Sequence, residues 1–176
     1  QVKKNTRIIS TTGYTSRELY QIRHDEKFKK GKDFYMVGGM GHASSVALGV
    51  SLRKKKSNII CLDGDGALIM HLGSLANIGF YAEKNFKHIV LNNYCHESVG
   101  GQSTNIENIN LKNLSSSCGY KKYFMISNLR KINSTLQKFL NSTGPSFLEV
   151  KIKSGVLRNL KRPKDLFRIK NKFMEK

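Results

Sequence analysis

What the chain has little of narrows the classes of protein to consider. Its 176 residues include no tryptophan, two prolines, three cysteines and only 12 acidic residues against 31 lysines and arginines. The cysteines have no C-x-x-C spacing, which excludes a disulfide framework and fits a reducing compartment. No run approaches the roughly 20 apolar residues of a membrane-spanning helix, and we expect no signal peptide before the first strand. We therefore expect one globular, cytoplasmic domain without a membrane partner.

The formal net charge of +19 raises nucleic acid or an anionic membrane as partners. The basic residues are spread over several segments, however, and are densest at 53–56 and 151–176. The chain contains no zinc knuckle, aromatic–glycine RNA motif or basic zipper. We interpret the charge as a solvated, lysine-rich surface that also attracts small anions, and we do not expect nucleic acid as a partner.

Short apolar runs and amphipathic segments alternate along the chain. The predicted strands are 7–10, 34–36, 58–62, 88–91, 123–126 and 147–150, and the predicted helices are 16–26, 42–52, 67–81 and 128–140. The helix 67–81 is apolar on most faces, Phe80 included, so we expect it to be buried. This order predicts an α/β fold, a doubly wound parallel sheet with helices on both faces. The predicted domain is 1–154, and 155–176 is a basic tail.

Polar residues follow two of the apolar strands at the point where each ends. The sequence Asp-Gly-Asp-Gly at 63–66 follows strand 58–62, and Asn92 and Asn93 follow strand 88–91. Carboxyl ends of parallel strands meet at the sheet edge where open α/β folds bind ligands. Either motif alone indicates an ordinary turn or a strand-ending loop. Together, with a crossover helix between them, they predict a site for a diphosphate and its cation.

Each residue of this site has a chemical reason. Carboxylate, amide and carbonyl oxygens suit Mg²⁺, which takes about six oxygen ligands and shares them between protein, water and phosphate. Asp65, Asn93 and the carbonyl of Cys95 are the predicted metal ligands. Flanking glycines let the backbone turn and approach an anion, and the following helix directs N–H groups toward it. The predicted diphosphate-binding residues are Gly64, Asp65, Gly66, Ala67 and Asn93.

These paired motifs resemble the signature of thiamine-diphosphate enzymes, in the domain that holds the diphosphate of the cofactor. The segments 10–20, 38–45, 95–104 and 155–163 are similar to the phosphonopyruvate decarboxylases. The sulfopyruvate decarboxylase beta subunits resemble the chain in the first segments but differ in the loop after the asparagines, at 96–98. The resemblance covers nearly the whole chain, but only the carboxyl-terminal half of the usual decarboxylase.

The resemblance implies further cofactor contacts. Met40 would push between the two rings of thiamine diphosphate, and the carbonyl of Gly38 would accept from its aminopyrimidine amine. Taken without the other motifs, Met40 is better explained as a core residue at a strand–helix turn. Threonines near a helix start also serve as N-caps, and His42 is equally well explained as a cap. The additional cofactor-binding residues that we predict are Thr12, Gly13, Thr15, Gly38, Gly39, Met40 and His42.

His96 and Glu97 are the predicted catalytic pair, because they follow the metal ligands in a loop similar to that of the phosphonopyruvate enzymes. The resemblance assigns neither a separate role. The remaining histidines have no such context and are expected to be structural or exposed; they are His24, His71 and His88.

The resemblance implies a thiamine-diphosphate- and Mg²⁺-dependent decarboxylation of a small anionic 2-oxo acid, 3-phosphonopyruvate to phosphonoacetaldehyde and CO₂. In this family the glutamate that activates the cofactor belongs to a separate pyrimidine-binding domain, and no segment here resembles it. Glu18, Glu83 and Glu149 lie in elements of the diphosphate domain. We therefore expect a partner chain or a missing amino-terminal half, in a homo- or hetero-oligomer. The alternatives are a sulfopyruvate-type subunit, a cofactor-binding domain without catalysis, and a basic nucleic-acid binder.

Overall fold

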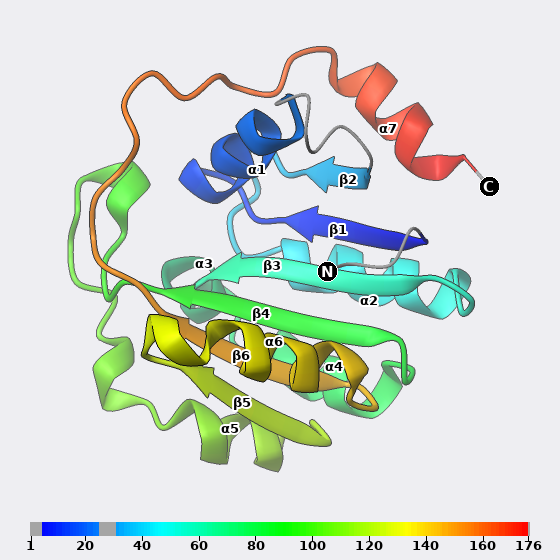
Figure 1. Ribbon diagram of the computed structural model, residues 1–176, viewed down its shortest axis with the longest axis vertical. Coiled ribbons are helices and arrows are strands. Elements are labelled where there is room, and N and C mark those ends of the chain that lie inside the picture. The colour runs from blue at the N-terminus through cyan, green and yellow to red at the C-terminus, as the bar shows by residue number, and fades with distance from the viewer. Residues whose placement is uncertain (1–4, 25–30, 176) are drawn as a thin grey trace.

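A computed structural model describes residues 5–24 and 31–175, in which six parallel strands form one sheet (Figure 1). The helices α2 and α4 lie behind this sheet in the view of Figure 1, and α6 lies in front of it. The predicted α/β class and doubly wound parallel sheet are confirmed. The strands are β1 Thr6–Ser10, β2 Lys32–Tyr35, β3 Asn58–Gly64, β4 Phe86–Asn92, β5 Lys122–Ile126 and β6 Ser146–Lys151.

Within the described ranges the chain also forms seven α-helices and three short 3-10 helices, of which all but α7 lie between strands. The α-helices are α1 Tyr14–His24, α2 Ala43–Arg53, α3 Asp65–Met70, α4 Ser74–Tyr81, α5 Leu111–Ser117, α6 Ile132–Asn141 and α7 Leu166–Met174. The 3-10 helices are η2 Glu97–Val99, η3 Ile106–Asn108 and η4 Leu129–Lys131. Most predicted boundaries fall within a few residues of these. The predicted end of the first helix, at 25–26, lies outside the described residues.

The strand order is β2-β1-β3-β4-β6-β5, so the chain changes direction across the sheet between β1 and β3. Ser10 of β1 is in register with Leu62 of β3, and Gly64 of β3 is in register with Leu91 of β4. The three strands therefore end at one edge. A reversal of strand order leaves a crevice outside the carboxyl ends of the strands, where ligands bind.

The core lies where the apolar runs predicted it. The central strands β3 and β4 are buried on both faces, as parallel strands covered by helices require. Ile59, Phe86 and Phe147 have no exposed surface and belong to the main cluster. A smaller cluster joins Phe139 of α6 to Leu148 of β6. Cys61 is fully buried, which confirms its interpretation as a small core residue.

The prediction of one buried helix over 67–81 is wrong. The segment forms α3 and α4, with a turn between them. Leu75 and Ile78 of α4 are buried, whereas Phe80 is 81% exposed and Met70 is 54% exposed. Apolar residues on most faces of a segment do not require burial on all of them, because a helix packed on one side buries only one stripe. The dipole expected to face the anion therefore belongs to a six-residue helix.

Two helices, α5 and α7, have no counterpart among the predicted elements. Asn110 caps α5, its side-chain oxygen accepting from the Asn113 N–H at 3.0 Å. Farther on, α7 packs on β2 (Figure 1), where Phe173 is buried with its ring 5.5 Å from that of Phe34. The predicted basic tail thus adds a helix to the sheet edge. No helix of the described residues has the length and apolarity needed to cross a membrane.

Candidate active site

A cleft of about 100 Å³ opens at the carboxyl ends of β1, β3 and β4. Most of the predicted site residues line it: Thr12, Thr15, Met40, Gly64, Asp65, Gly66, Ala67, Asn93, Cys95, His96 and Glu97. Gly13, Gly38, Gly39 and His42 belong to the adjoining loops and are not part of its lining. The Gly38 N–H donates to the hydroxyl of Thr12 at 3.1 Å, which ties two of these loops together.

Asp65 is the buried anion of the cleft, with 2% of its surface exposed. Burial raises the pKa of its carboxyl, and hydrogen bonds from Thr104 and from the backbone of Gly66 and Asn93 partly oppose that rise. The Thr104 hydroxyl donates to the carboxylate at 2.8 Å. The ends of β3 and β4 are thus brought into contact, as their motifs predicted. A desolvated carboxylate at a cleft favours a cation beside it.

Asn93 has its side-chain amide held at both ends. Its nitrogen donates to Glu97 Oε2 at 2.8 Å, and its oxygen accepts from the Cys95 N–H at 3.3 Å. Between them, Tyr94 has a φ of 64°, a left-handed conformation that is uncommon for a residue other than glycine. Such backbone conformations recur at ligand-binding sites. The three successive residues form a turn with the Asn93 oxygen on its inner side.

The turn at 38–41 requires its glycines, since Gly38, Gly39 and Gly41 have positive φ angles of 81°, 59° and 88°. A side chain at Gly41 would meet the His71 ring at 2.6 Å. The tight turn directs Met40 to the cleft lining, and its predicted cofactor contact stays a prediction.

The loop from 94 to 104 lies over the ends of β1 and β3. Cys95 and Ser103 form an antiparallel bridge, and the His96 N–H donates to the Gln102 carbonyl at 2.8 Å. The His96 ring rests on Gly66, where a methyl group would lie 2.4 Å from Nδ1. His96 is therefore seated directly against the predicted diphosphate-binding turn.

His42 precedes α2 at the N-cap position, but its side chain makes no capping hydrogen bond. Its ring lies 4.1 Å from that of His71, between centroids. The structure therefore does not support the capping alternative for His42, and its predicted cofactor contact stays a prediction.

Several lining residues were not predicted. Glu18 and Tyr14 of α1 line the cleft, and burial raises the pKa of the Glu18 carboxyl. The signal for Glu18 was available, because it lies three residues after Thr15 on the same helical face. Ile152 and Val156, after β6, also line the cleft. No local motif marks either residue; the resemblance of 155–163 was the only indication for Val156, and nothing indicated Ile152.

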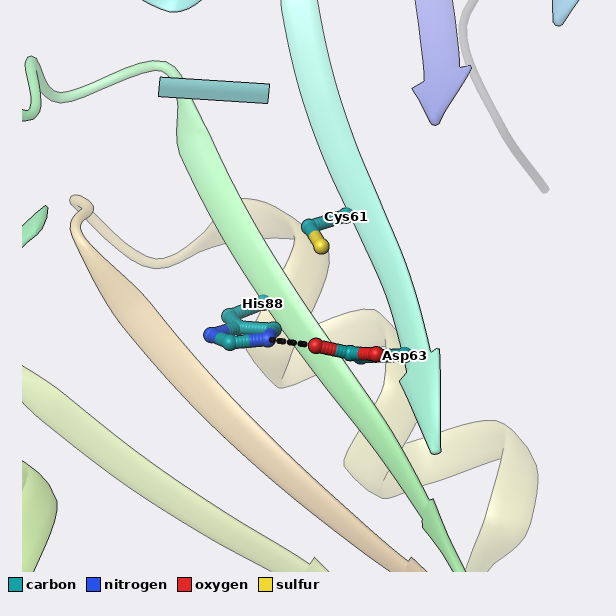
Figure 2. Close-up of side chains that lie close together, drawn as sticks. All are labelled: Cys61, Asp63 and His88. Carbon is teal, nitrogen blue, oxygen red and sulfur yellow. Dashed lines mark hydrogen bonds and ion pairs between the residues drawn. The ribbon is translucent and has the colours of Figure 1, made fainter. Parts of the chain in front are cut away.

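Asp63, the first aspartate of the Asp-Gly-Asp-Gly motif, faces the core and not the cleft. Figure 2 shows it with Cys61 and His88, and their potential ligand atoms lie within 4.8 Å of one another. His88 uses both ring nitrogens, at 3.4 Å from Asp63 Oδ2 and 2.9 Å from the hydroxyl of Tyr120. The other Asp63 oxygen accepts from the Gly64 N–H at 3.0 Å.

This cluster is better explained as a buried hydrogen-bond network than as a metal centre. The imidazole and carboxylate already have partners within the fold, and burial raises the pKa of the Cys61 thiol well above its usual range. A neutral thiol is a poor metal ligand. The network instead holds the end of β3 at Gly64, next to Asp65. It also confirms the structural role expected of His88.

Residues 11–150 match the family model described as "Thiamine pyrophosphate enzyme, C-terminal TPP binding domain". The chain is 38% identical to the phosphonopyruvate decarboxylase of Streptomyces viridochromogenes over 164 residues, 93% of this chain and 40% of that protein. It is 33% identical to the sulfopyruvate decarboxylase subunit beta of Methanothermobacter thermautotrophicus over 148 residues, 84% of this chain and 74% of the subunit.

An X-ray structure of an enzyme from Mycobacterium smegmatis, described as thiamin diphosphate-dependent, shares the fold with a TM-score of 0.68. The identity is 16%, over 87% of this chain and 29% of that one. The chain belongs to the family of thiamine pyrophosphate enzyme C-terminal, TPP-binding domains. It spans about two fifths of the phosphonopyruvate decarboxylases that it matches.

Proposed function

We propose that this chain supplies the diphosphate- and Mg²⁺-binding half of the active site of a 2-oxo acid decarboxylase, with 3-phosphonopyruvate as the substrate. The observation that carries the proposal is the buried Asp65 carboxylate in contact with the Asn93 backbone at the topological switch. Membership of the family supports thiamine diphosphate as the cofactor. The 38% identity to a phosphonopyruvate decarboxylase supports the substrate.

In this proposal the Asp65 carboxylate, the Asn93 amide oxygen and the Cys95 carbonyl hold the cation, which neutralises the diphosphate. Thiamine diphosphate, when bound, supplies the electron sink for the loss of CO₂. Met40 supports the cofactor from the turn at 38–41. Of the predicted catalytic pair, His96 is the group that we assign to substrate contact and proton transfer, because its ring lies on the floor of the cleft.

We propose that a pyrimidine-binding domain on a partner chain completes the site. Two glutamates, Glu18 and Glu97, line the cleft, and both belong to the domain that would hold the diphosphate. Three of the sulfopyruvate decarboxylase relatives are named as subunits beta, which supports a division of this enzyme type between chains. The cytoplasm remains the expected location.

The cation site is tested with Asp65→Asn, measured by calorimetry with Mg²⁺ and thiamine diphosphate in the presence of the pyrimidine-domain chain. We expect at least a tenfold loss of Mg²⁺-dependent cofactor affinity, because the neutral amide no longer pairs with the cation. Glu107→Gln removes one exposed carboxylate outside the cleft lining and is the matched control. Equal affinity of Asp65→Asn and the control would contradict the proposed site.

The substrate is tested by assaying the reconstituted enzyme side by side with phosphonopyruvate, sulfopyruvate and pyruvate. We expect the highest kcat/KM with phosphonopyruvate and no turnover by the purified chain alone. Preference for sulfopyruvate would reassign the substrate within the same chemistry. Absence of thiamine-diphosphate binding even with the partner present would instead favour a domain that has kept the fold without the reaction.

A further inference from the structure

Three hydrogen-bond donors, two from the stretch 93–95 and one from the chain after β6, converge on one oxygen of Glu97. Glu97 Oε2 accepts from Asn93 Nδ2 at 2.8 Å, from the Gly155 N–H at 3.0 Å and from the Cys95 thiol at 3.3 Å. A carboxylate that accepts this many bonds is fixed in position. The residue follows β4 in the chain, but Gly155 lies 58 residues farther on, after β6.

The first of these bonds decides which end of the Asn93 amide faces the cation. A carboxylate accepts hydrogen bonds and repels an amide oxygen, so it selects the rotamer with the Asn93 nitrogen toward Glu97. The Asn93 oxygen then points the other way, where the Cys95 N–H donates to it at 3.3 Å and its remaining lone pair is available to a cation. Partners of this kind commonly orient metal ligands.

The other bonds fasten the segment after β6 to the same loop. The Ser154 hydroxyl donates to the Asn93 carbonyl at 3.1 Å and lies 3.4 Å from the Cys95 sulfur. Next to it, Gly155 donates to Glu97. Ile152 and Gly155 line the cleft, so this connection holds one of its walls in place. Segments about 60 residues apart in sequence are thereby joined around the predicted metal ligands.

We infer that Glu97 is a positioning residue, which orients the Asn93 amide for cation binding and ties the chain after β6 to the loop after β4. The inference rests on the proposed function for the cation and replaces the predicted catalytic role of Glu97. His96, its neighbour, faces Gly66 at the floor of the cleft, whereas the Glu97 carboxylate is occupied by three donors.

Two substitutions of Glu97 distinguish positioning from chemistry. Glu97→Gln keeps an oxygen that can accept the same bonds, whereas Glu97→Ala removes it. If Glu97 positions Asn93, Glu97→Gln should retain Mg²⁺-dependent cofactor affinity within about threefold. Glu97→Ala should lose about 10- to 100-fold of this affinity, the usual range for partners of metal ligands. If Glu97 instead transfers a proton, both variants should lose kcat while their Mg²⁺ affinity stays unchanged.

The experiment uses the chain with its pyrimidine-domain partner and calorimetry with Mg²⁺ and thiamine diphosphate, and Glu107→Ala is the control. A second readout, amide hydrogen exchange at Gly155 in the ligand-free chain, should be faster in Glu97→Ala and near wild type in Glu97→Gln. If Glu97→Ala does not fold, Ser154→Ala takes its place, because it removes the neighbouring hydrogen bond from Ser154 to the Asn93 carbonyl. This variant is compared with wild type by the same exchange and affinity measurements. Unchanged values overturn the inference.

The inference is also overturned if Glu97→Ala matches wild type in Mg²⁺ affinity and in Gly155 exchange. It is likewise overturned if Glu97→Gln loses activity with full Mg²⁺ affinity. Failure of the proposed function gives a different result in the same measurements. In that case the wild-type complex binds neither cation nor cofactor, while the exchange at Gly155 still reports whether Glu97 holds the segment.

Discussion

Two glycines within helices should respond to alanine in opposite directions. Gly79 of α4 packs on a backbone turn, and a methyl group there would lie 1.5 Å from the Cys118 carbonyl oxygen and 3.0 Å from the Gly119 Cα. Gly49 of α2 has no atom within 4 Å of the corresponding position. Ordinary contact at this position begins at 3.4 Å. In Gly79→Ala the helix and the turn must therefore separate by about 2 Å in an otherwise close-packed interior.

The expected energies follow from this contact. Overpacking that displaces backbone costs about 1–3 kcal/mol or more, and moving α4 also loosens the fully buried Leu75 and Ile78. Replacing a helical glycine with alanine stabilises an open position by about 0.5–1 kcal/mol. We expect Gly79→Ala to lower the free energy of unfolding by about 3 kcal/mol, and Gly49→Ala to raise it by about 0.5–1 kcal/mol.

Thermal unfolding of the purified chain, followed by circular dichroism, measures both changes. For a chain of this size about 1 kcal/mol shifts Tm by roughly 2–4 °C, so Gly79→Ala should melt roughly 6–12 °C lower. Gly49→Ala should melt about 1–4 °C higher than wild type. A Tm for Gly79→Ala equal to or above that of Gly49→Ala would refute the close approach of α4 to the turn at Cys118.

Three further predictions concern groups buried elsewhere in the fold. Burial lowers the pKa of Lys87 to about 8, so between pH 8 and about 9.5 this group binds more protons in the unfolded chain and raises the free energy of unfolding by up to about 1.4 kcal/mol per pH unit. Because the raised pKa of the buried Cys61 thiol acts in the opposite direction in both proteins, the check is the difference between two urea titrations, in which the slope with pH should be more positive in wild type than in Lys87→Met. His88→Leu leaves the buried Asp63 without its imidazole and should cost about 2–4 kcal/mol in the same titration, whereas an unchanged midpoint would argue against the network. Phe173→Ala should cost about 3 kcal/mol and Phe167→Ala less than about 0.5, because the first ring is buried under α7 and the second is 70% exposed; equal costs would show that α7 does not pack as described.

The parts of the fold that the sequence predicts are those with a local cause. The strands β3 and β4 are continuous apolar runs because helices cover both of their faces, and their ends carry polar residues because the sheet stops there. Asp65 and Asn93 could therefore be assigned to one cleft from two short motifs. The positions of Met40 and His96 required the family resemblance as well.

The parts that escaped prediction depend on contacts between distant segments. Nothing local distinguishes the core-facing Asp63 from the cleft-facing Asp65. Their separation arises because the chain passes from β3 into α3 between the two residues. The exposed Phe80 and the buried Phe173 likewise depend on which helix faces the sheet. Ile152 lines the cleft only because β6, which precedes it, pairs with β4.

The cleft draws its lining from the first turn of the chain at Thr12, from its middle at Asp65 and from the stretch after β6 at Gly155. A ligand bound in this cleft therefore contacts segments from the beginning, the middle and the end of the domain at once. Its binding energy opposes separation of either flank of the sheet, so saturation with cofactor should protect distant strands from unfolding together. Resistance of the edge strands to proteolysis should then increase when cofactor binds in the cleft, although these strands do not contact it.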